Sequence, residues 1–191
     1  MELAAMQRQL RDLIKHSDHP TADDPPYIRR VADSPGLAMV QEIILWWRTS
    51  LLQQYCRLTA QALQARQCFA ETVHAFTRAR ALSPFIEELG EAFLQDMRQH
   101  PDSLVASVAQ FEYALWCVKR GHEQSYVVHW DYEPYGILHC LMQGLPLATA
   151  QRRGRYQTVV SRHIPGHFQV RAVPPGSLDV EHALLQSVCP T

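Results

Sequence analysis

Hydrophobic positions along this chain change their spacing at Gly121. Before Gly121 they recur every three or four residues, as in amphipathic helices. After it, short runs alternate between apolar and polar residues, which predicts strands. The two clearest helical stripes are Leu37, Val40, Ile44, Trp47 and Leu51, and Leu104, Val108, Phe111, Leu115 and Val118. We therefore expect an α+β protein, with a helical bundle over residues 1–121 and a small antiparallel sheet domain over residues 122–191.

Capping and breaking residues place the expected helices. Ser83 and Asp102 are typical N-caps, and Gly121 is a typical helix stop. The segment Ser17–Pro26 contains three prolines and three aspartates, so it is expected to be a linker or loop. The expected helical segments are Glu2–His16, Gly36–Cys56, a pair within Leu58–Ala81, one from Ser83 to before Pro101, and one from Asp102 to Gly121.

The C-terminal part is expected to combine three strands with short helices. Glu133 and Pro134 open a helix that Gly144 closes, and Pro165-Gly166 fits the centre of a type II turn. That turn would join two of the strands into a hairpin. The expected strands are Ser125–Trp130, Tyr156–Arg162 and His167–Val173, and a last helix is expected over Leu178–Val188.

Composition narrows the class of protein. Charged residues make up 19% of the 191 residues, below the roughly 25% of a typical globular domain, which favours association with another protein. A net charge of −1 provides no overall field for nucleic acid. No apolar run is long enough for a transmembrane helix, and Met1–Lys15 lacks the apolar core of a signal peptide. The five cysteines show no C-x-x-C spacing, so we expect reduced, mostly buried thiols and a cytoplasmic location.

Candidate chemistry is sparse. His129 and Asp131 share one face of an expected strand, His163 and His167 flank the turn, and His139 precedes a cysteine. None of them belongs to an H-E-x-x-H or C-x-x-C motif, so we expect no metal or other cofactor in this chain. The glutamates Glu87, Glu88 and Glu91 are expected to be solvated near a helix start. A free-standing enzyme that uses His129, Asp131 or His139 stays an open alternative, because catalytic partners meet only in space.

One basic cluster and two tryptophans are candidate binding residues. Arg152, Arg153 and Arg155 precede a strand, where they would grip phosphates or an acidic peptide, or serve as a solvated edge that discourages aggregation. Trp46 lies about 100° around its helix from Trp47 of the apolar stripe. It is therefore either a core residue of a thick bundle or an anchor for a partner, and Trp130 is the second candidate for a partner interface.

Two stretches carry a resemblance to a known group of proteins. They are Trp46-Trp-Arg-Thr-Ser-Leu-Leu-Gln-Gln-Tyr-Cys-Arg-Leu-Thr59 and Phe93-Leu…Pro101…Leu104…Val108-Ala-Gln-Phe-Glu-Tyr-Ala-Leu115. Together they resemble the HvfC/BufC-type family, which has an arginine-bearing helix, a YP-x-T turn and a later F-L…L-x-x-L-A-x-L/F-E-W/Y-A helix. Here Cys56-Arg57 stands where the turn usually has proline. The segment from Tyr132 to Leu147 and the hairpin are similar to the family's closing sheet.

The resemblance is strongest to the MbnC-like subunits of methanobactin biosynthesis, a copper-chelator pathway, and to the related TglI-type partners. It implies a non-catalytic subunit in a heterodimer with a TIM-barrel, multinuclear-iron oxidase of the MbnB/TglH kind. The iron would belong to that partner, which modifies cysteines of a ribosomally made precursor peptide to an oxazolone and a thioamide. This chain would recognise the leader of the peptide. Because parts of the family have been labelled as DNA-binding, a nucleic-acid-binding module with a winged-helix-like sheet is the alternative.

An exposed sheet edge would suit an extended leader peptide, because main-chain hydrogen bonds give affinity and side-chain pockets give register. We therefore expect the hairpin to accept the leader as an extra strand, with nearby arginines pairing to its carboxylates. The expected peptide-binding residues are Arg152, Arg153, Arg155, Tyr156, Thr158, Val160, Phe168 and Val170.

Overall fold

The computed structural model describes residues 3–16, 20–21, 24–80, 85–147 and 152–174. These residues form eight α-helices and a three-stranded antiparallel sheet, so the α+β class is confirmed. The helices are α1 (Leu3–His16), α2 (Pro26–Ala32), α3 (Pro35–Tyr55), α4 (Arg57–Ala65), α5 (Phe69–Ala79), α6 (Ile86–Met97), α7 (Ser103–Lys119) and α8 (Pro134–Gln143). The strands are β1 (Tyr126–Tyr132), β2 (Arg153–Val160) and β3 (Phe168–Ala172).

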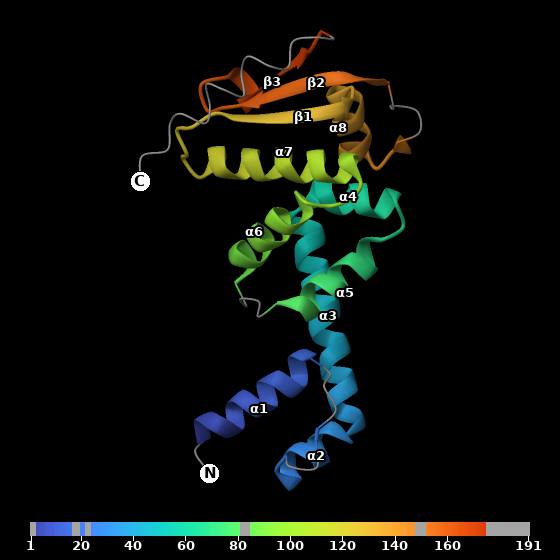
Figure 1. Ribbon diagram of the computed structural model, residues 1–191, viewed down its shortest axis with the longest axis vertical. Helices are drawn as coiled ribbons and strands as arrows, with labels where there is room; N and C mark the ends of the chain where they lie inside the picture. The colour runs from blue at the N-terminus through green and yellow to red at the C-terminus, as the bar shows by residue number, and fades with distance from the viewer. Residues whose placement is uncertain (1–2, 17–19, 22–23, 81–84, 148–151, 175–191) are drawn as a thin grey trace.

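The molecule is elongated (Figure 1). The sheet lies at one end and rests on α7, α1 and α2 lie at the other end, and α3 runs between them. We call α4–α8 with the sheet and the C-terminal end of α3 the body. We call α1, α2 and the preceding part of α3 the arm. The expected cap at Ser83 and the expected helix Leu178–Val188 lie outside the described residues.

Local signals set many of the element boundaries. The Asp102 carboxylate accepts hydrogen bonds from the backbone N–H groups of Leu104 (2.9 Å) and Val105 (3.4 Å), as an N-cap does. Glu133 caps α8 in the same way, and Gly144 ends that helix with a φ of 66°. The helix α2, which starts at Pro26, was not expected from the sequence.

The expected type II turn is confirmed. Gly166 has a φ of 73° and a ψ of 7°, and the backbone N–H of His167 donates to the carbonyl of Ile164 at 2.8 Å. The turn joins β2 to β3. Glycine tolerates this positive φ because it has no Cβ.

The buried core is continuous across Gly121. Aromatic side chains from both sides of that residue meet inside it: Phe111 of α7 contacts Trp130 of β1 and Phe168 of β3, with ring centroids 5.9 Å and 5.1 Å apart. The inward face of the sheet thus packs on α7. Cys56, Cys117 and Cys140 are buried free thiols, as expected, and Cys68 is half-buried.

Candidate functional site

The order of strands decides which sheet edges are open. It is β1-β2-β3, so β2 is the central strand and is hydrogen-bonded on both sides. Within the expected hairpin, the first strand therefore has no free edge, and only the second strand can accept a peptide. Thr158 and Val160 of β2 are buried and face α7. Their side chains lie on the inward face of the sheet. Of the three strands, only β1 and β3 have outer edges.

The register of β3 shows which backbone groups face outward. The N–H of Val173 donates to the carbonyl of Arg155, and the N–H of Ser161 donates to the carbonyl of His167, both at 2.9 Å. In an antiparallel ladder such hydrogen-bonded pairs alternate with non-hydrogen-bonded ones. Gln169 and Arg171 therefore point their backbone groups at β2. The residues that point theirs away from β2 are Phe168, Val170 and Ala172.

The two edges differ in what covers them. By the same alternation, Val127 and His129 direct their backbone groups away from β2. The hydroxyl of Ser107 on α7 donates to the carbonyl of His129 at 2.8 Å. One outward carbonyl of the β1 edge therefore already has a hydrogen-bond partner. Within the described chain, we find no hydrogen bond on the outer side of β3. The outer edge of β3 is therefore the better receptor for an added strand.

Aromatic side chains flank the β3 edge on the inward face of the sheet. Phe168 and Val170 are half-buried there, and the exposed ring of Tyr135 lies 5.9 Å from the ring of Phe168. Alternate side chains of an added strand would extend this apolar surface. Sequence reasoning missed Tyr135, although its place next to the helix-opening pair Glu133-Pro134 puts it at the start of α8, beside the sheet.

The three arginines lie at the N-terminal end of β2. Arg152, Arg153 and Arg155 are exposed, and the guanidinium of Arg153 lies 5.9 Å from the centroid of the Tyr132 ring. Because β2 and β3 are antiparallel, this basic end lies beside Ala172, the last residue of β3. The arginines are thus placed to meet a carboxylate at one end of the β3 edge.

The two candidate tryptophans lie in opposite environments. Trp130 is only 3% exposed and packs on Phe111, so it is a core residue and not part of a surface for a partner. Trp46 is 66% exposed. Trp47 is 57% exposed, against the expectation that its stripe faces the core.

Trp46 and Trp47 belong to a larger exposed surface on α3. Five large apolar side chains fall within about 120° of the helix circumference, at 100° per residue. We call this set the α3 apolar face; its members are Met39, Val40, Ile43, Trp46 and Trp47. Contiguous apolar surface of this kind marks sites of protein association.

The histidine candidates do not converge. His129 and Asp131 are both exposed on the outer face of the sheet, as their spacing predicted. His139 is exposed whereas the neighbouring Cys140 is buried, and Nε2 of His163 lies 3.6 Å from the carboxylate of Glu123. Within the described ranges, no three side chains of His, Cys, Asp or Glu come together as metal ligands would. Among the glutamates, Glu87 pairs with Arg120 at 2.6 Å.

The two stretches that carry the family resemblance meet inside the body. The carboxylate of Glu112 on α7 accepts hydrogen bonds from the backbone N–H groups of Leu58 (2.9 Å) and Thr59 (2.8 Å) and from the Thr59 hydroxyl (2.7 Å). It therefore caps the N-terminus of α4, where Cys56 supplies no capping side chain. Burial raises the pKa of Glu112, while these hydrogen bonds lower it. These two stretches thus have a structural role here, which is to join α4 to α7.

No helix in the described part of the chain is long and apolar enough to cross a membrane. Comparison with protein-family models, with curated proteins and with solved structures finds no match for this chain.

Proposed function

We propose that this chain is a non-catalytic partner subunit of a multinuclear-iron oxidase of the MbnB/TglH kind. In that role it binds the leader of a ribosomally made precursor peptide while the oxidase modifies the peptide's cysteines. The observation that carries the proposal is the outer edge of β3. It combines outward backbone groups, flanking apolar side chains and a basic end, which together suit an extended peptide that contains acidic residues.

The α3 apolar face supports the second half of the proposal, a stable heterodimer. Tryptophan is among the residues that dominate binding energy at protein interfaces, and Trp46 and Trp47 are adjacent and exposed. We assign this face to the oxidase rather than to the peptide, because it lies on α3 and away from the sheet (Figure 1). The two surfaces therefore allow peptide and enzyme to be held at the same time.

Ala172 offers a direct test of strand addition. Ala172→Pro removes an outward N–H and places the proline ring on the β3 edge, while the β2–β3 hydrogen bonds stay intact. Ala172→Ser keeps the N–H and is the matched control. We expect the proline variant to bind the leader at least about tenfold more weakly, from the lost hydrogen bond and the clash, and the serine variant to bind like the parent.

Gln169→Pro is a poorer probe, because it breaks a bond between β2 and β3. Leader binding by both Ala172 variants is measured by titration with a fluorescent leader peptide of a cysteine-containing ribosomal precursor, and circular dichroism checks their folding. Equal leader binding by folded Ala172→Pro and by the parent would contradict strand addition at β3.

The partner is tested separately with Trp46→Ser/Trp47→Ser. Affinity purification of the parent from the native cell should recover an iron-containing oxidase, and the double variant should lose it while still binding leader. Recovery of no iron protein with the parent would rule out the partner-subunit proposal.

A nucleic-acid-binding module is the second candidate, with a winged-helix-like use of the sheet. It is favoured by the three exposed arginines at one end of the sheet. DNA binding by the parent should then weaken steeply as the salt concentration rises. Replacing Arg152, Arg153 and Arg155 with glutamine should abolish it. Under the first proposal, the same triple variant weakens leader binding only modestly, since exposed pairs contribute roughly 0.2–1 kcal/mol each.

A further inference from the structure

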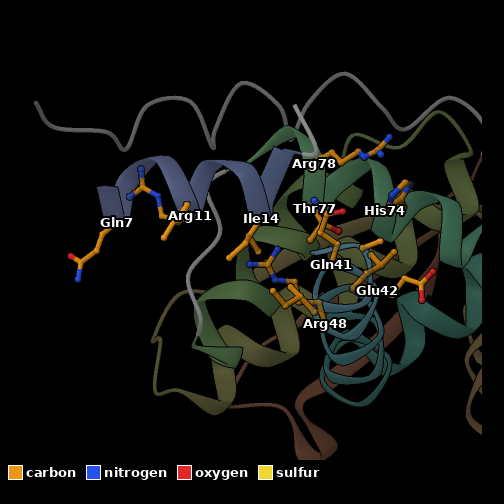
Figure 2. Close-up of a pocket in the computed structure, with 13 residues that line it drawn as sticks. Gln7, Arg11, Ile14, Gln41, Glu42, Arg48, His74, Thr77 and Arg78 are labelled. Carbon is orange, nitrogen blue, oxygen red and sulfur yellow. The ribbon is translucent and has the colours of Figure 1, made fainter. Parts of the chain in front are cut away.

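A groove separate from both surfaces lies between α1, α3 and α5 (Figure 2). Its volume is about 570 Å³, within the usual range for small-molecule sites. Both main walls contribute apolar side chains, Leu10 and Ile14 from α1 and Ile44 and Leu45 from α3. The side-chain amide of Gln41 donates to the carbonyl of Leu13 at 3.1 Å and ties these two walls together.

The charged residues of the lining are mostly cationic. Arg11, Arg48 and Arg78 line the groove, against the single carboxylate of Glu42. Arg11 is paired with Asp12 at 3.0 Å. In Figure 2, Arg48 extends across the groove in the direction of Ile14, whereas the guanidinium of Arg78 points away from it. One arginine is thus aimed into a groove whose exposed lining surface is mostly apolar.

Arg48 lacks the partner that a half-buried charge normally has. Within the described residues we find no ion pair and no side-chain hydrogen bond of its guanidinium, and burial lowers its pKa. Burying a charge is costly unless it is paired. A bound anion would supply that partner, and the planar guanidinium fits a carboxylate through two parallel hydrogen bonds.

We propose that this groove binds an amphiphilic carboxylate of the medium-chain fatty-acid class. The carboxylate pairs with Arg48, and the alkyl chain lies along the side chains of Leu10, Ile14 and Leu45. A multiply charged ligand such as a nucleotide is disfavoured, because one guanidinium faces inward and most of the exposed lining surface is apolar. The inference goes beyond the proposed partner-subunit function and does not depend on it.

Calorimetric titration of the full chain with dodecanoate tests the proposal, with dodecanol as the neutral analogue. We expect saturable binding of dodecanoate and binding of dodecanol at least about tenfold weaker, since the alcohol cannot form the charge-assisted pair. Absence of saturable dodecanoate binding, or equal affinity for the two, would overturn the proposal.

Three variants locate the ligand. Arg48→Met keeps an unbranched, flexible side chain but removes the guanidinium and its charge, and should weaken dodecanoate binding about tenfold without changing dodecanol binding. Arg78→Met is the matched control and should bind dodecanoate like the parent. Trp46→Ser/Trp47→Ser should also leave binding unchanged, because these residues lie outside the groove. Equal losses in the two arginine variants, or loss in the tryptophan variant, would show that the ligand sits elsewhere.

Discussion

The arm and the body use similar hydrophobic patterns with opposite results. In the body, the stripe of α7 is largely buried, with Leu104, Val108 and Phe111 at 2% exposure or less. In the arm, the likewise apolar helix α3 exposes Val40, Ile43 and both tryptophans. Periodicity therefore identifies residues that share a helix face. It does not identify what covers that face.

The difference has a geometric cause. The 21 residues of α3 span about 31 Å at 1.5 Å per residue. The body covers its C-terminal end, where Leu52 is fully buried. Toward the N-terminus α1 and α2 pack against it, and Leu13 and Ile28 are the buried hydrophobic residues of those two helices. The described residues of the arm therefore do not cover all of the apolar surface of α3.

The largest expected effect is at the centre of the body. Phe111→Ala removes a ring packed between Trp130 and Phe168, and should lower the free energy of unfolding by about 3–5 kcal/mol. Urea denaturation followed by circular dichroism measures it. Tyr135→Ala, which removes an exposed ring next to Phe168, should cost less than about 1 kcal/mol. Similar costs for the two variants would mean that the sheet and α7 do not share a packed core.

The helix cap inside the body should give the next largest effect. Glu112→Ala leaves the donors of Leu58 and Thr59 without their acceptor, at a cost of about 2–4 kcal/mol in unfolding free energy. Glu112→Gln keeps an acceptor oxygen and should cost less. The comparison uses urea denaturation at neutral pH, and an alanine variant as stable as the parent would show that α4 does not need this cap.

The same side chain predicts a pH dependence. Because burial raises the pKa of Glu112 in the folded state, the folded protein holds this proton to a higher pH than the unfolded chain does. The stability of the parent relative to Glu112→Gln should therefore be highest in acid and should fall as pH rises above the ordinary glutamate pKa. A difference between the two proteins that does not vary with pH would contradict the raised pKa.

The smallest expected change in unfolding free energy is in the arm. The same substitution, isoleucine to alanine, is made in the arm and in the body, so the two regions are compared directly. Ile43→Ala trims the exposed α3 apolar face and should change the unfolding free energy by no more than about 0.5 kcal/mol. Ile137→Ala, the same substitution at a fully buried position of α8, should cost about 2–5 kcal/mol. Thermal and urea unfolding of the two variants measures both changes in the free energy of unfolding. A large cost at Ile43 would mean that its side chain is covered in solution.

The sequence by itself determined the features that depend on neighbouring residues. Asp102 and Glu133 mark helix starts, Gly144 marks a helix end, and Pro165-Gly166 forms the expected turn, because capping and turn geometry depend on a few adjacent residues. The alternating run around Val128 likewise gave a strand, with His129 and Asp131 on one face as expected. Such signals act over one or two turns of chain and need no knowledge of the rest of the fold.

Only the tertiary structure decided how these elements cover one another. Pairing of β1 with β2 made β2 central and left β3 as the better edge, although the sequence indicated only a hairpin. Packing placed Trp130 inside the body and Trp46 outside, and brought Glu112 to the start of α4, more than fifty residues away. These outcomes depend on contacts between segments that are far apart in the sequence. Side-chain periodicity carries no information about which distant segment packs against a given helix or strand.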